Sequence, residues 1–255
     1  MARIFAIASG KGGVGKTFFS INLSRALSIF GYKTLLIDLN LTTPNVSINL
    51  NLVNEEKNIH RYLRGEIEIK DAIINYKDNL FVIPGSLNIN NLINISLEKL
   101  KSGIVKLYDD FDYIILDSAA GIGREALESV KNSEEVIVIT NYEKSALLDA
   151  YRLVRTLEKL DINILGIVIN KVKKEKINFV VLERFFRKEI LGIVHYDENV
   201  KISLDYGIPL IDYKKSSIAA IDVFRIAEKI TGREYRYFEE RKGLFNKFLE
   251  LFKWK

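Results

Sequence analysis

Four residues near the start of the chain have the types and the spacing needed to hold a triphosphate. Gly10, Gly15, Lys16 and Thr17 satisfy the pattern G-x-x-x-x-G-K-[ST]. Glycines let the backbone curl closely enough for several N–H groups to point at one anion. The lysine supplies charge for the β and γ phosphates, and the threonine hydroxyl can bind Mg²⁺. The pattern therefore predicts a site for a nucleoside triphosphate with Mg²⁺.

The segments on either side of this loop support the prediction. The apolar run at residues 4–8 predicts a strand, and residues 19–30 predict a helix that Gly31 ends. Because the helix begins at the loop, its positive N-terminal end would face the phosphates. We expect the other residues of the loop to contact the nucleotide as well: Gly12, Gly13, Val14 and Phe18.

Lys11 stands inside the loop, where an ordinary phosphate-binding loop has no lysine. With its neighbours it forms the run Gly10-Lys11-Gly12-Gly13-Val14-Gly15-Lys16-Thr17, which resembles the variant loop of the MinD/ParA family of ATPases. The resemblance covers essentially the whole chain and implies ATP or ADP with Mg²⁺ as cofactors and a homodimer when ATP is bound. It also implies that Lys11 crosses the dimer interface to the partner's nucleotide, where a cation can stabilise charge on transferring phosphate. The alternative is a solvated loop lysine.

Two apolar runs end on a carboxylate. Residues 33–38 predict a buried strand that ends at Asp38, and residues 113–117 predict another that ends at Asp117. In phosphate-loop NTPases an aspartate at the end of such a strand acts on Mg²⁺ through its coordination shell. We therefore expect Thr17, Asp38 and Asp117 at the metal, and Lys16 and Asp117 in the chemistry, although both aspartates could be simple strand caps. Residues 118–123 resemble the second switch of the family.

Asn40 departs from the family pattern, because relatives most often carry Asp-x-Asp in this first switch. The resemblance implies that the second carboxylate orients or activates the attacking water. Asparagine has almost the same shape but takes no proton and carries no negative charge. The sequence thus predicts a chain that binds ATP and Mg²⁺ but hydrolyses ATP slowly. Natural divergence and a replacement made to trap nucleotide would both explain this residue.

A third group of residues is expected near the nucleotide base. Asn170 and Lys171 follow the predicted strand at residues 164–169 and resemble the adenine-reading site of the family, in which an asparagine uses both its donor and its acceptor. An asparagine in an ordinary turn is the alternative. His195 and Asp197 stand where relatives usually have a proline-led turn against the base, and we also expect Pro209 near it. His195 and His60 have no metal-ligand neighbours at useful spacing.

The elements that must position these residues follow from the remaining pattern. Further strands are predicted at residues 80–83, 136–140 and 190–194, and helices at residues 58–63, 69–75, 97–108, 145–160, 200–206 and 216–230. Residues 39–49 predict a loop, and residues 88–94 carry no assignment. Strands that alternate with helices indicate an α/β fold with one doubly wound, mostly parallel sheet and helices on both faces. In such a fold, ligands bind at the carboxyl edge of the sheet.

Composition narrows the class of protein. The chain has 255 residues, of which 48% are apolar and 28% charged, as in a globular protein. The absence of cysteine excludes disulfides, thiol catalysis and cysteine-held zinc or iron–sulfur clusters. The net charge of +5 is too mild to imply nucleic acid by itself. Because no signal peptide and no membrane span are visible, we expect a cytoplasmic protein. No internal repeat or Gly/Ser-rich linker occurs, so residues 1–232 predict one ATPase domain.

The C-terminal segment, residues 233–255, has a different character. It carries seven basic and four acidic residues, and its apolar side chains follow helical spacing: Leu244, Phe245, Phe248, Leu249, Leu251, Phe252 and, at the end, Trp254. A short helix that is aromatic on one side and basic on the other would lie in the headgroup layer of an anionic membrane. MinD members of the family end in such a segment, which implies peripheral attachment to the inner face of the cell membrane. A helix docked on the domain's own core is the alternative.

The residues and the resemblance together predict a dimerising switch ATPase that binds membrane reversibly. It would take part in positioning the division site or another apparatus through an unidentified activator or cargo protein. Two other functions stay open. A ParA-like ATPase would bind DNA non-specifically as an ATP dimer. A small-molecule ligase with the same loop would need a substrate pocket that no motif indicates.

Overall fold

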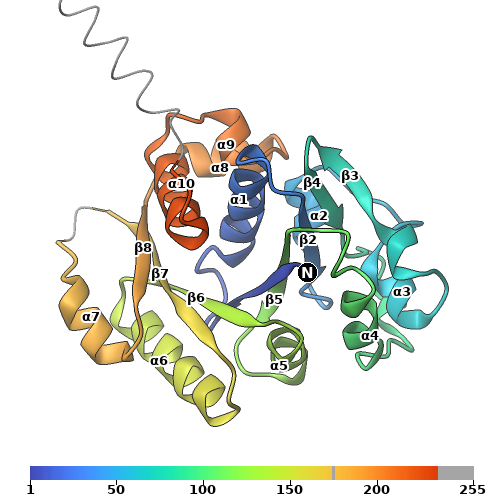
Figure 1. Cartoon of the computed structure of the whole chain (residues 1–255), viewed down its shortest axis with the longest axis horizontal. Coiled ribbons are helices and arrows are strands. Elements are labelled where there is room, and N and C mark those ends of the chain that lie inside the picture. Colours follow the sequence, from blue (N-terminus) through green and yellow to red (C-terminus); the bar gives the residue numbers. More distant parts are fainter. Residues whose placement is uncertain (174–175, 235–255) are drawn as a thin grey trace, which may run out of the picture.

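A single eight-stranded sheet runs through the part of the chain that the computed structural model describes, residues 1–173 and 176–234. Its strands lie in the order β3-β4-β2-β5-β1-β6-β7-β8 (Figure 1). All neighbouring strands are parallel except the edge pair β3 and β4. The bounds are β1 (Arg3–Ser9), β2 (Thr34–Leu39), β3 (Ile74–Lys77), β4 (Leu80–Ile83), β5 (Tyr113–Ala120), β6 (Glu135–Asn141), β7 (Ile164–Val172) and β8 (Ile190–His195).

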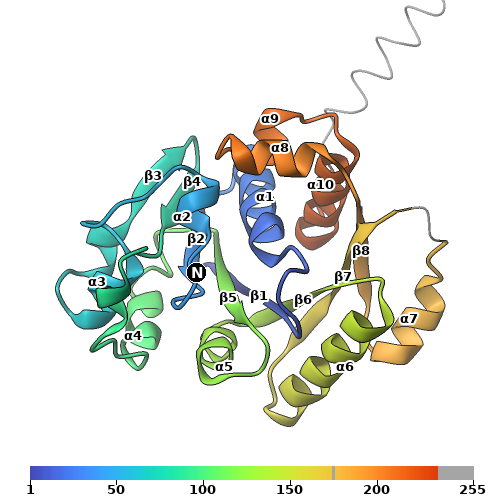
Figure 2. The same ribbon diagram turned by 180° about the vertical axis from the view of Figure 1, so that it is seen from behind.

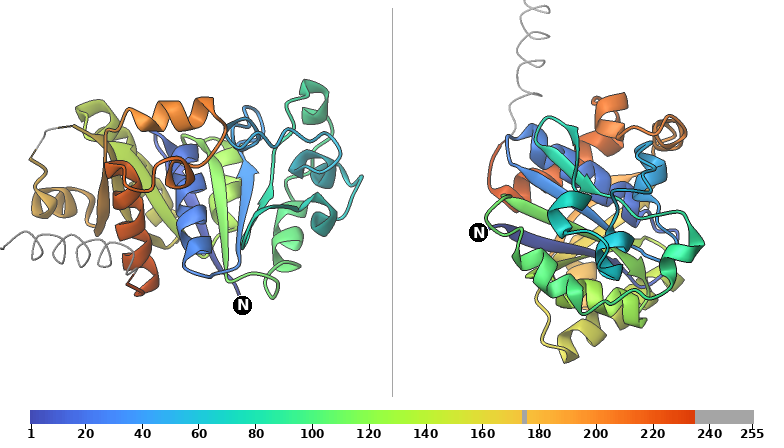
Figure 3. Two further views of the ribbon diagram at one scale, coloured as in Figure 1. Left: turned by 90° about the horizontal axis from the view of Figure 1, so that it is seen from above. Right: turned by 90° about the vertical axis from the view of Figure 1, so that its right-hand side faces the viewer.

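Helices cover both faces of this sheet. One face carries α1 and α10 with α8 and α9 beside them, and the other carries α4, α5, α6 and α7 (Figures 1 and 2). The bounds are α1 (Lys16–Ile29), α2 (Val46–Asn49), α3 (Ile59–Arg64), α4 (Lys99–Val105), α5 (Arg124–Lys131), α6 (Lys144–Lys159), α7 (Phe179–Phe186), α8 (Asn199–Asp205), α9 (Leu210–Tyr213) and α10 (Ile218–Thr231), with 3₁₀ turns η1 (Ile69–Ala72) and η2 (Ile89–Leu92). Figure 3 shows the same layers from above and from the side.

The near-continuous apolar runs of the central strands are explained by this double cover. Side chains alternate along a strand, so Ile4 and Ala6 of β1 pack into the core on one face, while Phe5 and Ile7 pack into the core on the other. Every residue of β2 is buried for the same reason. The doubly wound, mostly parallel sheet predicted from the sequence is thus confirmed.

The strand order brings the predicted site residues to one place. β1 pairs with β5 on one side and with β6 on the other. Strands β2 to β5 therefore lie on one side of β1, and strands β6 to β8 lie on the other. The register places Asp38 of β2 directly opposite Asp117 of β5. Because the loops after β1, β2 and β5 leave the same edge, a ligand at that edge meets all three.

Several segments differ from the sequence prediction. The helix expected at residues 69–75 is wrong in its second half, because the 3₁₀ turn ends at Ala72 and β3 forms an antiparallel hairpin with β4 around Asp78, which has φ 48°. The loop expected at residues 39–49 contains α2. Helices α5 and α7 were not predicted, since they are short and lie beside loops.

The described chain ends just after α10. Gly232 follows this helix with φ 67°, a left-handed conformation that favours glycine and ends the helix. None of the helices in the two described ranges is long and apolar enough to span a membrane. The amphipathic helix predicted between residues 244 and 254 lies outside the described residues.

Candidate functional site

The loop between β1 and α1 requires glycine at two positions for different reasons. Gly15 has φ 96°, and a Cβ there would also collide with the side-chain amide of Asn170. Gly10 has no such backbone constraint, but a Cβ would collide with the backbone of Asp149 in α6. The loop is therefore held close to β7 on one side and to α6 on the other.

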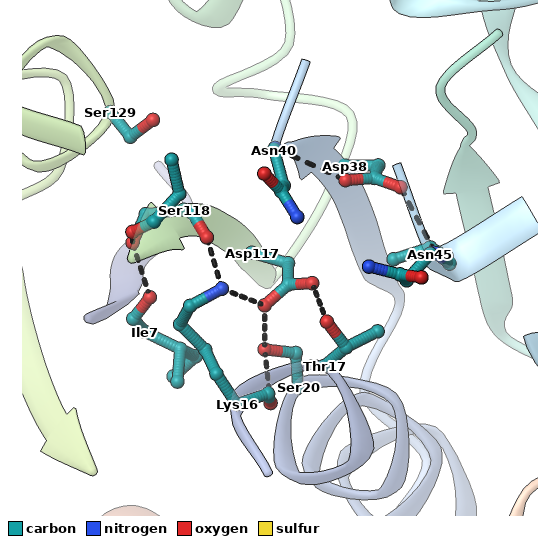
Figure 4. A network of polar contacts seen from close by, with 12 residues as sticks. Ile7, Lys16, Thr17, Ser20, Asp38, Asn40, Asn45, Asp117, Ser118 and Ser129 are labelled. Carbon is teal, nitrogen blue, oxygen red and sulfur yellow. Dashed lines mark hydrogen bonds and ion pairs between the residues drawn. The ribbon is translucent and has the colours of Figure 1, made fainter. Parts of the chain in front are cut away.

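Lys16 and Thr17 converge on Asp117 at the start of α1 (Figure 4). The Lys16 Nζ lies 3.5 Å from Asp117 Oδ1 and donates a hydrogen bond to the Ser118 carbonyl oxygen. The Thr17 hydroxyl donates to Asp117 Oδ2 at 2.6 Å, and the Ser20 hydroxyl donates to Oδ1 at 2.9 Å. Because the Asp117 side chain is fully buried, these three donors are what offset the loss of water around its charge.

Asp38 is the second buried carboxylate of the site. Its Oδ1 accepts from the Asn40 N–H at 3.1 Å and its Oδ2 from the Val46 N–H at 3.0 Å, which fixes the N-terminus of α2. Burial, together with the neighbouring charge of Asp117, raises the pKa of Asp38 to about 8, against the opposing effects of the two backbone donors and Lys16. A bound cation would relieve this repulsion.

The donor set fits Mg²⁺. Two carboxylates and the Thr17 hydroxyl are hard oxygen ligands, which Mg²⁺ prefers. The described residues hold no group of three or more His, Cys, Asp or Glu side chains that could bind a metal alone.

Asn40 is engaged in a local turn rather than pointing freely into the site. Its Nδ2 donates to the Thr43 carbonyl oxygen at 2.5 Å, and its Oδ1 accepts from the Thr43 hydroxyl at 3.1 Å. The turn fixes the segment between β2 and α2 at the carboxyl edge of the sheet.

A cavity of about 550 Å³ opens above these residues and is large enough for a polyphosphate. Its lining residues are Ser9, Gly12, Gly13, Val14, Gly15, Lys16, Thr17, Phe18, Asn40, Thr42, Thr43, Asn45, Asn49, Ala119, Ala120, Glu125 and Leu204. Here we call it the phosphate cavity. Gly10 and Lys11 do not line it, and Lys11 is exposed.

A second cavity of about 280 Å³ adjoins the first at Gly15 and Phe18 and is mainly apolar. Of the residues expected at the base, it is lined by Asn170, Lys171, His195 and Asp197. We call it the base cavity. Pro209 lines neither cavity. It is the residue directly before α9, and its carbonyl oxygen accepts from the Asp212 and Tyr213 N–H groups of that helix.

Polar contacts hold two walls of the base cavity in place. Asn170 Nδ2 donates to the Val14 carbonyl oxygen and Lys171 Nζ to the Gly13 carbonyl oxygen, both at 2.7 Å, so β7 is tied to the phosphate loop. On the other wall, both the backbone N–H and the Nδ1 of His195 contact Asp222 Oδ2, at 2.9 and 2.7 Å.

Three functional candidates escaped the sequence prediction. Ser20 lies one helical turn after Lys16, Asp222 is a buried carboxylate on the apolar face of α10, and Glu125 lines the phosphate cavity from α5. For Asp222 the available signal was a polar residue among the apolar neighbours of α10. Ser20 is one of several polar residues buried along α1, with Ser24 and Ser28, and the sequence did not distinguish it from them. Nothing in the sequence around Glu125 distinguished it from other helix-surface carboxylates.

Comparisons with known proteins agree with this geometry. The family model of the CobQ/CobB/MinD/ParA nucleotide binding domain matches residues 5–210. An uncharacterised ATP-binding protein of Methanocaldococcus jannaschii is 31% identical over 98% of this chain and 96% of its own length. The cell division ATPase MinD of Pyrococcus furiosus has a similar structure, with a TM-score of 0.86 at 34% identity, covering 91% of this chain and 99% of that one. The septum site-determining protein MinD of Pyrococcus horikoshii, solved with Mg-ADP, gives a TM-score of 0.85 at 31% identity, covering 90% and 96%.

Proposed function

Because this chain belongs to the CobQ/CobB/MinD/ParA family of nucleotide-binding proteins, we propose that it is a Mg²⁺-dependent ATPase that works as a dimerising switch. The observation that supports this most is the convergence of Lys16 and Thr17 on buried Asp117 beneath a cavity of polyphosphate size. The family, and the Mg-ADP complex of the Pyrococcus horikoshii protein, agree with nucleotide and Mg²⁺ as the cofactors.

The chain's own residues divide the work of binding. The loop from Gly10 to Thr17 curls around the phosphates, and Lys16 turns from Asp117 toward the β and γ phosphates when they arrive. Thr17, Asp38 and Asp117 would hold Mg²⁺, which would neutralise negative charge on the phosphates. Asn170, Lys171, His195 and Asp197 would enclose the base, with Phe18 near the α phosphate.

Dimerisation follows from Lys11 in this proposal. Because Lys11 is exposed and does not line the phosphate cavity of its own chain, it is available to a nucleotide held by a second copy of the chain. A cation brought to the γ phosphate only in the dimer would couple hydrolysis to assembly. Nucleotide state and oligomeric state would then change together.

The cellular role is proposed from the relatives and from the tail. The Pyrococcus proteins are described as a cell division ATPase and a septum site-determining protein, so we propose a role in positioning the division site or another apparatus, with an activator or cargo protein as partner. We further propose that residues 233–255 bind an anionic membrane, so that two weak tails on an ATP dimer gain about 10²- to 10⁴-fold in avidity.

Sedimentation with anionic lipid vesicles tests the membrane arm of the proposal. The full chain should sediment with vesicles in ATP more than in ADP, and a chain that ends at Glu240 should stay in the supernatant. Binding that ignores the nucleotide, or that survives the truncation, would contradict the proposal.

We also propose that ATP hydrolysis is slow because Asn40 stands where relatives most often carry an aspartate, and replacing Asn40 with aspartate tests this. Asn40→Asp should raise the ATP turnover of the full chain, because a carboxylate can accept a hydrogen bond and a proton from water. Equal turnover in the two chains would contradict a water-positioning role for residue 40.

The alternative is an ATPase that binds DNA non-specifically. The chain has a net charge of +5, of which residues 233–255 carry +3 and the rest carries +2. Retention of the ATP-bound chain without residues 233–255 on DNA, falling steeply with salt, would favour this alternative over membrane binding.

A further inference from the structure

Glu125 brings a carboxylate into the phosphate cavity. It stands in the first turn of α5, directly after the glycine-rich segment that follows β5. Among the described residues that line this cavity it is the one acidic side chain, since Asp38 and Asp117 lie beneath the lining. A carboxylate beside a polyphosphate is repelled by it, so the position of Glu125 is electrostatically unfavourable for nucleotide binding alone. A role in the reaction would explain this position.

A specific contact holds Glu125 against the segment between β2 and α2. Its Oε1 accepts from the Thr42 N–H at 3.2 Å, and its Oε2 accepts from the Thr42 hydroxyl at 2.9 Å. Each oxygen of a carboxylate can accept two hydrogen bonds, so both keep acceptor capacity for a further donor. The contact with Thr42 thus orients the Glu125 side chain and leaves its oxygens able to accept a hydrogen bond from another donor.

Asn40 explains why Thr42 is available for this contact. The two hydrogen bonds between Asn40 and Thr43, one donated by each residue, close a short turn. Thr42 lies within that turn, and its N–H and hydroxyl both donate to Glu125 of α5. Asn40 itself stands beside Asp38 (Figure 4) and contributes an amide, not a charge. The segment that lacks its own carboxylate therefore binds a carboxylate from a different element.

The backbone that carries Glu125 is well anchored. Ala126 and Val130 of α5 are buried, and the Ser129 hydroxyl donates to the Glu125 carbonyl oxygen at 3.0 Å. A side chain that must act on one water molecule needs a fixed backbone of this kind, because a misplacement of about 1 Å can lower the rate 10²-fold.

We propose that Glu125 supplies the carboxylate that Asn40 lacks in ATP hydrolysis, with Thr42 as its positioning residue. The inference rests on the proposed ATPase function. A water oxygen forms a bond to the γ phosphorus while the bond from that phosphorus to the β–γ bridging oxygen breaks and its electron pair leaves with ADP. Glu125 accepts the proton that the water loses and then releases it to solvent or to the departing phosphate.

The test compares Glu125→Gln with a matched control on the same helix. Glutamine keeps the shape and can still bond Thr42, through its oxygen to the N–H and through its amide to the hydroxyl, but it takes no proton. Glu128→Gln is the control, since Glu128 pairs with Lys131 and does not line the phosphate cavity. Single-turnover hydrolysis and the dissociation constant of ATP are measured for each full chain.

Glu125→Gln should slow single-turnover hydrolysis by about 100-fold while changing the ATP dissociation constant less than threefold, because proton acceptance acts in the transition state and not in binding. Glu128→Gln should leave both unchanged. Adding Asn40→Asp to Glu125→Gln should recover at least a tenth of the lost rate, because a carboxylate then returns to the cavity.

Hydrogen exchange of the Thr42 amide in the nucleotide-free chain supplies a readout that does not depend on turnover. Glu125→Ala should accelerate this exchange by more than tenfold, whereas Glu125→Gln should preserve most of the protection. No change in the alanine variant would overturn the positioning of Glu125 by Thr42.

Two results would overturn the proposal as a whole. They are a Glu125→Gln variant that hydrolyses ATP within about threefold of the parent, and a loss of ATP binding in that variant. A parent chain that shows no turnover above the uncatalysed reaction, or that binds no ATP at all, is a different result, because it would refute the proposed ATPase function itself.

Discussion

At the scale of single residues, the site is governed by two buried carboxylates that face each other across neighbouring strands. Asp117 is offset by Lys16, Thr17 and Ser20, whereas Asp38 is offset mainly by backbone N–H groups and has a raised pKa. Without a bound cation, the two carboxylates of Asp38 and Asp117 repel each other. The chain without nucleotide should therefore be sensitive to any loss of a donor to Asp117.

Ser20→Ala tests this sensitivity. Removal of its hydroxyl leaves Asp117 with one hydrogen bond fewer, which should lower the free energy of unfolding by about 1–3 kcal/mol. The matched control is Ser24→Ala, because Ser24 is equally buried but donates only to the Ser20 carbonyl oxygen. Urea unfolding without nucleotide measures both, and equal losses in the two variants would contradict the account.

His60 predicts a pH dependence of stability. Its Nδ1 accepts from the Ser86 N–H at 3.0 Å, so the hydrogen lies on Nε2, which faces the Leu41 carbonyl oxygen at 3.0 Å. Burial lowers the pKa of His60, with Arg64 acting in the same direction and Glu55 and Glu125 opposing it. A histidine whose pKa is lowered in the folded state stabilises fully above its unfolded pKa of about 6.5 and less as the pH falls.

The free energy of unfolding of the parent should therefore fall relative to that of His60→Gln as the pH is lowered from 7.5 to 5. Glutamine can accept and donate at the same two places without titrating, and the other titrating groups cancel in the difference. Urea unfolding across this range provides the measurement. A difference that stays constant with pH would show that His60 is not held neutral.

At the scale of elements, the base cavity depends on a contact between β8 and α10. Asp222 holds both the backbone and the ring of His195, so this carboxylate shapes the wall that the base would meet. Asp222→Ala should weaken ATP binding by about tenfold, whereas the affinity for tripolyphosphate, which has no base, should not change. Competition with a fluorescent nucleotide measures both ligands.

Two further variants sharpen this prediction. Asp222→Asn should retain most of the ATP affinity, because one amide oxygen can accept both contacts that now reach Oδ2. Arg225→Ala on the exposed side of α10 is the control and should bind like the parent. An equal loss of ATP and tripolyphosphate affinity in Asp222→Ala would assign Asp222 a general structural role.

The sequence predicted those strands whose two faces are both buried, and it did not predict contacts between residues far apart in the sequence. The central strands were evident because both of their faces are covered, which requires long apolar runs. The edge strand β3 was missed because only alternate residues are partly buried, so its pattern is weak. The contacts of Ser20 and Glu125 join residues 97 and 83 positions apart, and no local pattern reports such a pairing.

At the scale of the whole molecule, the account expects the nucleotide to control assembly through Lys11. Lys11→Ala should bind ATP with unchanged affinity as a monomer but fail to form the ATP dimer, because the exposed lysine would act only on the partner's phosphates. Sedimentation velocity with and without ATP measures the association. Unchanged dimerisation together with unchanged hydrolysis would contradict this role.

The central claim is that the loop between β1 and α1 binds Mg²⁺-ATP through Lys16, and titration calorimetry of the full chain tests it most directly. The account predicts one ATP per chain, with an affinity that falls at least tenfold when Mg²⁺ is chelated or when Lys16 is replaced by Gln. A chain that takes up no ATP, or one that binds it equally well with Lys16→Gln, would contradict the account.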